Sequence, residues 1–277
     1  MKTLKYIPRT TLFFCLFVSL IGFEHLSCAE EIELPAKENF HLYLLAGQSN
    51  MAGRGQVSEQ DKIPHPRVMM LTREGEWAPA VDPLHFDKSI AGVGPGKTFG
   101  IEMADDNENV VIGLIPTACG GSSITKWVPG AHHGQTESQP YDDAIVRTKR
   151  AMEDGVLKGV LWHQGEADVQ GERAENYKAC LIVLVDRFRT EFDDPNLPII
   201  IGQLGQFPQK PWKSGTHKVD DAQQEFASET ENAGFVSSDG LTCKSDNTHF
   251  NAESQREFGR RYAEVYREVT NPRQATN

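Results

Sequence analysis

The chain has 277 residues, 39% of them hydrophobic and 24% charged, which is typical of a globular protein that builds its core without disulfides. This length fits one α/β domain or two small ones. The formal net charge of −11 disfavours nucleic acids and anionic membranes as partners and favours neutral over polyanionic substrates.

The N-terminus carries the pattern of a secretory signal peptide. Three basic residues lie within the first nine positions, an apolar run covers 11–23, and Ser27-Cys28-Ala29 follows as a small-x-small cleavage site. The run is short for a membrane span and no second hydrophobic stretch follows, so we expect no membrane insertion of the mature chain. A lipoprotein acylated on Cys28 is the weaker alternative, because His25 stands where such signals have an aliphatic residue.

Residues 1–29 are therefore predicted to be removed after Ala29, and 30–277 to form a single domain that is secreted or periplasmic. Three basic residues and one acidic residue leave with the signal, which takes the net charge from −11 to −13. The cysteines that remain, Cys119, Cys180 and Cys243, match no zinc spacing. Their pairing stays open, with Cys119 and Cys243 as the first pair to test because each lies beside a motif described below.

The first half of the domain begins with a buried strand and continues through a long region, 56–97, without helical periodicity. Two short segments of that region flank Glu74-Gly75 and could form a hairpin. The elements predicted in this half are, in chain order, a strand at Leu42–Ala46, the hairpin at Arg67–Thr72 and Trp77–Val81, a helix at Thr98–Asp106, a strand at Val110–Ile115 and a helix at Tyr141–Glu153.

The second half alternates strands and helices regularly. Its predicted elements are, in chain order, a strand at Val156–Trp162, a helix at Tyr177–Phe188, a strand at Pro198–Leu204, a helix at Val219–Glu231, a strand at Gly234–Ser237 and a helix at Ala252–Val269. Strands separated by helices indicate parallel pairing through right-handed crossovers. The predicted fold class is therefore α/β, a single three-layer α/β/α sandwich with a parallel sheet of about five strands.

Ser49 follows the first predicted strand directly, in a turn where Gly47 permits a tight backbone. Open α/β sheets bind their ligands at the carboxyl ends of the strands. The stretches 120–122, 164–166 and 246–249 are expected at the same edge, so their loops can converge on the serine. An isolated Gly-x-Ser is better read as an ordinary turn, but with these three stretches Ser49 becomes a candidate nucleophile.

A serine hydroxyl needs a base, and His249 is the candidate. Asp246 precedes it by three residues in a short polar loop before the last helix, so one loop can present both side chains. The carboxylate would hold the imidazole in the required tautomer. Taken alone, the same residues fit a capped loop before a helix equally well; together with the Ser49 turn they favour catalysis.

An acyl-transfer site also needs donors for the developing oxyanion. The natural set is the N–H of Ser49, the N–H of Gly120 or Gly121, and the side-chain amide of Gln164. Each also has an ordinary structural interpretation, the two glycines as a flexible turn and Gln164 as a polar residue that satisfies loop backbone.

Four blocks resemble a known family in this order: Gly-Gln-Ser-Asn-Met at 47–51, Gly-Gly-Ser at 120–122, Trp-His-Gln-Gly-Glu at 162–166 and Asp-x-x-His at 246–249. They are similar to the SGNH (GDSL-like) hydrolase superfamily, and within it to the sialate O-acetylesterase group, which includes the acetyl xylan esterases of carbohydrate esterase family 6. The resemblance runs from about Phe40 to Val269. It implies a flavodoxin-like sandwich and a metal-independent esterase that releases acetate from sugar hydroxyls.

The resemblance also implies roles for single residues: Ser49 as nucleophile, His249 as base, Asp246 as the orienting acid, and Gly121 with Gln164 in the oxyanion hole. The asparagine usual in the third block of the superfamily is replaced by Gln164, as in this subgroup. The longer side chain can shift the hole, so the glycine that completes it stays open.

Four further residues have weaker assignments. Glu166 is a rival for the orienting acid, although the spacing favours Asp246, and Arg54 could neutralise a buried acid, hold the serine turn or form a surface salt bridge. Trp127 and Asn50 are candidates for contact with the substrate, with packing over the loop as an equal alternative for Trp127. No metal-ligand spacing such as His-Glu-x-x-His occurs, so no metal or other cofactor is predicted.

The sequence thus predicts a secreted serine esterase that removes acetyl groups from a carbohydrate. Two other classes stay open: a carbohydrate-binding protein of this fold without turnover, and a lipase or thioesterase with the same triad. The polar loops at 92–96 and 126–139 favour a hydrophilic substrate over a lipid. The sequence leaves open which sugar carries the acetyl group.

Overall fold

The computed structural model describes residues 33–271. The predicted signal peptide and its cleavage site after Ala29 lie outside the described residues. Within residues 33–271, no helix is both long enough and apolar enough to cross a bilayer.

A seven-stranded sheet forms the centre of the domain, with the strand order β3-β2-β4-β1-β5-β6-β7. The strands are β1 Phe40–Gly47, β2 Val68–Leu71, β3 Trp77–Pro79, β4 Val111–Pro116, β5 Val156–His163, β6 Ile199–Gly202 and β7 Ala233–Val236. All neighbours pair in parallel except β2 and β3, which are antiparallel.

The predicted three-layer α/β sandwich is confirmed, and its five predicted parallel strands form the order β4-β1-β5-β6-β7. This is the flavodoxin-like order, in which the strands diverge from a switch point between the first strand and its later neighbour. The predicted number of strands is too low. The predicted hairpin exists as β2 and β3, and β2 pairs in parallel with β4, so the hairpin extends the sheet at one edge.

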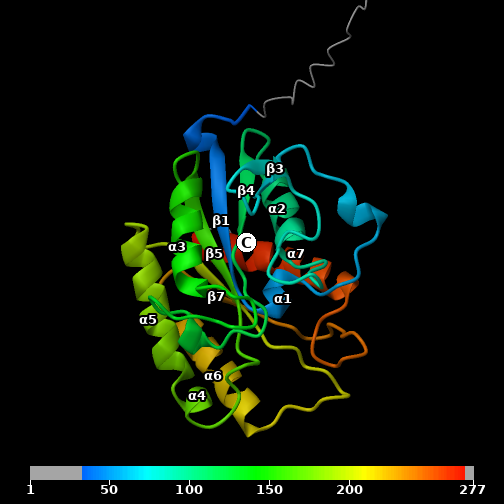
Figure 1. The fold of residues 1–277 in the computed structure, drawn as a ribbon, viewed down its shortest axis with the longest axis vertical. Coiled ribbons are helices and arrows are strands. Elements are labelled where there is room, and N and C mark those ends of the chain that lie inside the picture. The colour runs from blue at the N-terminus through cyan, green and yellow to red at the C-terminus, as the bar shows by residue number, and fades with distance from the viewer. Residues whose placement is uncertain (1–32, 272–277) are drawn as a thin grey trace, which may run out of the picture. The chain divides into compact units, whose positions relative to one another are not determined.

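Helices cover both faces of the sheet (Figure 1), with α3 and α5 on one face and α2 and α7 on the other. The helices are α1 Ser49–Ala52, α2 Gly96–Asp105, α3 Pro140–Ala151, α4 Glu172–Glu175, α5 Tyr177–Glu191, α6 Ser214–Glu229 and α7 Ala252–Thr270. The five long helices correspond to the five predicted ones. Helix α6 begins five residues earlier than predicted, because its first turn is polar and carries no apolar periodicity.

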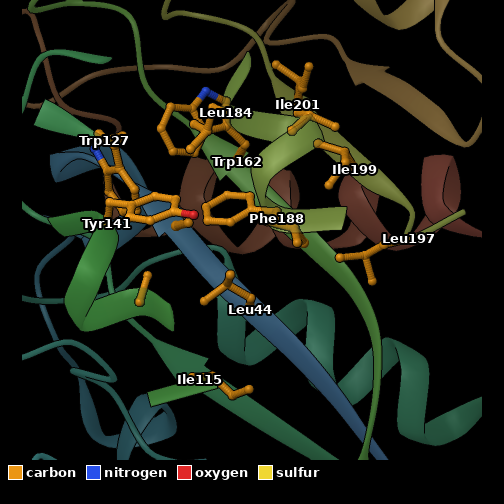
Figure 2. Close-up of a cluster of buried hydrophobic side chains, with 14 of the residues drawn as sticks. Leu44, Ile115, Trp127, Tyr141, Trp162, Leu184, Phe188, Leu197, Ile199 and Ile201 are labelled. Carbon is orange, nitrogen blue, oxygen red and sulfur yellow. The ribbon is translucent and has the colours of Figure 1, made fainter. Parts of the chain in front are cut away.

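Successive residues of β1 supply the two halves of the core, as the two-residue period of a strand requires. Leu42, Leu44 and Ala46 lie in one hydrophobic cluster, which includes side chains of α3, α5 and α6 (Figure 2). Tyr43 and Leu45 lie in the other, which includes side chains of α2 and α7. Because β1 is buried on both faces, it is apolar from Leu42 onwards rather than alternating.

The chain leaves β1 at the switch point, between β4 and β5, and the backbone there is tight. Gly47 has a φ of +127°, and a Cβ at this position would lie 2.2 Å from the carbonyl oxygen of His163 in β5. The same oxygen accepts a hydrogen bond of 2.8 Å from the N–H of Gln48. Glycine is therefore required for β1 to stay in contact with β5 up to the residue before the serine turn.

Candidate active site

Ser49, His249 and Asp246 meet above the carboxyl end of β1. The Nε2 atom of His249 lies 2.9 Å from the Oγ of Ser49, and its Nδ1 lies 2.9 Å from the Oδ2 of Asp246. Ser49 opens α1 one residue after the end of β1, whereas the other two residues lie in the loop before α7. The arrangement has the connectivity of a Ser-His-Asp triad, in which the imidazole accepts the hydroxyl proton and the carboxylate fixes the tautomer.

Asp246 shapes its own loop and still has one oxygen for the imidazole. Its Oδ1 accepts hydrogen bonds of 2.9 Å from the N–H groups of Thr248 and His249, as an aspartate does when it closes a turn on itself. Burial raises the pKa of Asp246, but these two N–H groups and the His249 ring outweigh burial and lower the pKa to about 2. The carboxylate is therefore ionised at neutral pH, as an orienting acid must be.

Two of the predicted oxyanion donors are already engaged in the structure. The N–H of Gly120 donates to the Oδ2 of Asp87 at 2.8 Å. The Nε2 of Gln164 donates to the Oδ2 of Asp168 at 2.6 Å and to the carbonyl oxygen of Ser122 at 2.9 Å, with its side chain fully buried. The structure does not support donor roles for Gly120 and Gln164, because both groups already donate to acceptors within the protein.

Two other donors of the predicted set have no acceptor within residues 33–271: the N–H groups of Ser49 and Gly121. Gly121 has a φ of +83°, and a Cβ there would lie 2.6 Å from the Oε1 of Gln135. The loop that carries Gly121 is joined to the end of β1, because the N–H of Cys119 donates to the carbonyl oxygen of Gly47 at 2.9 Å. The second block is thus fixed beside the serine turn.

Arg54 and Asp87 form a buried ion pair beneath this part of the site. The Nη2 of Arg54 lies 2.6 Å from the Oδ2 of Asp87, and the two side chains are 2% and 1% exposed. Arg54 also donates to the carbonyl oxygen of Gly53 at 2.6 Å, so it both neutralises a buried acid and holds the serine turn. Sequence reasoning missed Asp87, which lies in the aperiodic region 56–97 with no motif around it.

Asn50 and Trp127 do not face the solvent, so the predicted contacts with substrate are not supported. Asn50 is 1% exposed and its side chain bonds to protein groups. Trp127 is fully buried, donates from Nε1 to the Oγ of Ser122 at 3.0 Å, and packs edge-to-face on Trp162 (Figure 2). Trp127 therefore anchors the loop after the second block to the core, in agreement with the alternative prediction that it packs within the protein.

The carboxylate that contacts the His249 ring is that of Asp246. Glu166 instead contacts the residue after the serine, because its Oε1 accepts a hydrogen bond of 2.6 Å from the Nδ2 of Asn50. Burial raises the pKa of Glu166. Burial also lowers the pKa of the neighbouring His163 to about 3, so this histidine is neutral and structural.

A pocket of about 350 Å³ lies beside the triad loop, between that loop and the segment after β6. Thr248 and Glu166 line it on the side of the triad, and Phe207 and Trp212 contribute apolar surface. Lys210 also lines it and donates from Nζ to the Oγ1 of Thr248 at 2.9 Å. Sequence reasoning missed this pocket, because residues 203–213 form an irregular segment without a periodic pattern.

The three cysteines within residues 33–271 are free thiols, so the disulfide between Cys119 and Cys243 suggested by their positions is not formed in the structure. Burial raises the pKa of the Cys119 thiol to about 11, which leaves it un-ionised at neutral pH. In residues 33–271 no three His, Cys, Asp or Glu side chains are grouped so as to hold a metal ion.

The model of a family described as carbohydrate esterase, sialic acid-specific acetylesterase, matches residues 39–268, which is most of the sequence. The chain belongs to this family. The match confirms the resemblance to the sialate O-acetylesterase group and the enzyme class, a carboxylic-ester hydrolase acting on carbohydrate esters.

Relatives of this carbohydrate esterase agree with the assignment. A probable carbohydrate esterase of Arabidopsis thaliana is 33% identical over 258 residues, which cover 85% of this chain and 93% of that protein. A solved structure of a protein from Arabidopsis thaliana has a TM-score of 0.73 at 31% identity and covers 84% of this chain and 99% of that chain.

Two more distant structures share the fold. NanS has a TM-score of 0.66 at 18% identity, covering 87% of this chain and 100% of its own. A carbohydrate acetylesterase from Xanthomonas citri has a TM-score of 0.66 at 22% identity, covering 82% of this chain and 56% of that chain.

Proposed function

We propose that this carbohydrate esterase is a serine hydrolase that removes acetyl groups from sugar hydroxyls through an acetyl-enzyme. The observation that supports this most is the unbroken contact from the Oγ of Ser49 through the His249 ring to Asp246, with both distances 2.9 Å. That geometry activates a hydroxyl at neutral pH without a metal ion.

In the first half of the reaction, a bond forms between the Oγ of Ser49 and the acetyl carbonyl carbon, while the hydroxyl proton moves to the Nε2 of His249. The N–H groups of Ser49 and Gly121 stabilise the oxyanion, since they are the members of the donor set that have no other acceptor. The bond from the carbonyl carbon to the sugar oxygen then breaks, and His249 returns the proton to that oxygen.

In the second half, His249 takes a proton from water, and the resulting hydroxyl attacks the acetyl group on Ser49. The ester bond to Ser49 breaks, acetate leaves, and His249 returns its proton to the Oγ. Asp246 stays ionised throughout and stabilises the imidazolium that forms twice in each cycle.

The pocket of about 350 Å³ beside Thr248 is the proposed place for the sugar, because it opens next to the base and combines aromatic surface with polar groups. The family description suggests an O-acetylated sialic acid, and the acetylated polysaccharide suggested by the sequence remains the second substrate to compare. We further propose that the enzyme is exported, on the basis of the signal-peptide pattern in residues 1–29.

The test is hydrolysis of 4-nitrophenyl acetate and of acetylated sugars by Ser49→Ala. Loss of activity with an unchanged circular dichroism spectrum is expected, and Ser228→Ala, which alters an exposed serine of α6, serves as the control with full activity. Retained hydrolysis in Ser49→Ala would refute the mechanism. Acetate release by the wild type excludes a protein that only binds carbohydrate, and a preference for acetyl over long-chain esters excludes a lipase or thioesterase.

A further inference from the structure

Asn50, the residue after the nucleophile, bonds to the main chain on both sides of the catalytic histidine. Its Nδ2 donates to the carbonyl oxygen of Thr248 at 3.2 Å, and its Oδ1 accepts from the N–H of Phe250 at 3.2 Å. These are the two residues that flank His249. One planar amide, attached to the turn of Ser49, thus fixes the peptide groups before and after the base.

Glu166 receives the shortest of the hydrogen bonds made by the Asn50 amide. Its Oε1 lies 2.6 Å from the Nδ2 of Asn50. The carbonyl oxygen of Thr248 can only accept a hydrogen bond and the N–H of Phe250 can only donate one, so these two groups select the orientation of the amide. In that orientation Nδ2 also faces Glu166, which therefore reinforces it. Asn50 is 1% exposed, so water cannot replace these partners, and the reverse orientation would leave buried groups unsatisfied.

Asn50 itself is held from a third direction. The Nε2 of Gln255, a fully buried residue of α7, donates to the carbonyl oxygen of Asn50 at 3.1 Å. The residue is therefore connected to the loop after β5, to the triad loop and to α7. Every displacement of the His249 loop relative to Ser49 must stretch or break at least one of these bonds.

We propose that Asn50 is a positioning residue that keeps the Nε2 of His249 within hydrogen-bond distance of the Oγ of Ser49, with Glu166 reinforcing the orientation of its amide. This inference rests on the proposed roles of Ser49 and His249. A misplacement of about 1 Å in a reacting group can cost on the order of 10²-fold in rate. The expected effect is on kcat rather than on KM, because Asn50 does not reach the substrate pocket.

The experiment compares steady-state hydrolysis of 4-nitrophenyl acetate by wild type, Asn50→Ala, Glu166→Ala and Glu166→Gln, with Asn251→Ala as the matched control. Asn251 caps α7 in the same loop, accepting from the N–H of Ser254 at 2.9 Å, but does not contact the serine turn. Asn50→Ala should lose about 10- to 100-fold in kcat with KM within twofold. Glu166→Ala should lose less, and Glu166→Gln should recover part of the loss because its amide oxygen can still accept.

The control separates positioning from general loosening of the loop. Asn251→Ala should lower the melting temperature but keep kcat within twofold.

The proposal is overturned if Asn50→Ala retains kcat within twofold, or if Asn251→Ala loses kcat by the same factor. If Asn50→Ala does not fold, equal kcat values in Glu166→Ala and the wild type overturn it instead. Ser49→Ala is measured in parallel: its activity decides the proposed function, so a failure of the triad is distinguished from a failure of the positioning role.

Discussion

The buried ion pair between Arg54 and Asp87 allows a prediction about the cost of leaving a buried charge without its counter-ion. Asp87→Ala removes the acceptor of the Arg54 guanidinium and of the Gly120 N–H. The guanidinium is then left with the carbonyl oxygen of Gly53 as its remaining partner, in a place where the side chain is 2% exposed. A charge that is buried without its counter-ion is costly to the folded state.

The expected size follows from a comparison with a second pair in the same chain. Lys149 and Glu191 also lie 2.6 Å apart, but their side chains are 52% and 38% exposed. Removing one partner of a buried pair costs about 3–5 kcal/mol, whereas an exposed pair contributes about 0–1 kcal/mol. Asp87→Ala should therefore lower the free energy of unfolding by several times as much as Glu191→Ala.

Urea unfolding, followed by circular dichroism, measures both variants. With an m-value of about 2–3 kcal/mol per molar urea, the midpoint should fall by about 1–2 M in Asp87→Ala and by less than about 0.5 M in Glu191→Ala. The folded Asp87→Ala protein should also lose kcat, because the loop that carries Gly121 loses the hydrogen bond from the Gly120 N–H to Asp87. Equal midpoints in the two variants would refute the reasoning, since the two pairs have the same distance and only the Arg54–Asp87 pair is buried.

Three further predictions concern single residues. Gly47→Ala should lower the free energy of unfolding in urea by at least about 2 kcal/mol and abolish activity. Gly130→Ala should cost less, because Gly130 also has a positive φ, +73°, but a Cβ there would have nothing within 4 Å. Equal costs would exclude a clash with His163. Asp246→Asn should lower kcat roughly 10²- to 10⁴-fold at pH 7 with little change in KM, and an unchanged rate would remove this carboxylate from the mechanism. Burial raises the pKa of Asp82 from 3.8 to about 7. Between these two pH values the folded protein keeps a proton that the unfolded chain loses, so the free energy of unfolding falls as pH rises, by on the order of 4 kcal/mol. Asp82→Asn should abolish this fall, as measured by urea unfolding at pH 4 and pH 8.

The parts of the site that could be predicted from the sequence are those whose geometry is local. Asp246 and His249 lie three residues apart in one loop, and the turn of Ser49 follows a strand whose apolar run is unmistakable. Their convergence needed only the rule that parallel strands end at one edge. No long-range information beyond the order of the strands was required.

The parts that could not be predicted depend on where a side chain points after packing. Gln164 has the right chemistry for an oxyanion donor, but Asp168, four residues later, accepts a hydrogen bond from its amide. Trp127 carries an aromatic ring that could stack on a sugar, but this ring is buried in the core. Asp87 has no local pattern, and its role appears only when the region 56–97 folds back beside Gly120.

The same limit explains the number of strands. The hairpin of β2 and β3 was visible in the turn at Glu74-Gly75, but the pairing of β2 with β4 is a contact between segments about 40 residues apart. Hydrophobic patterns indicate a strand, whereas its neighbours are set by the tertiary fold.

The position of that hairpin at the edge of the sheet also affects whether the sheet can pair with a strand of another molecule. Its antiparallel strand β3, Trp77–Pro79, has three residues and ends in a proline, which has no N–H to offer to an incoming chain. Short outer strands with proline resist edge-to-edge aggregation. Lengthening β3 with alternating apolar residues should therefore allow this edge strand to pair with other copies of the chain and cause fibrous aggregation.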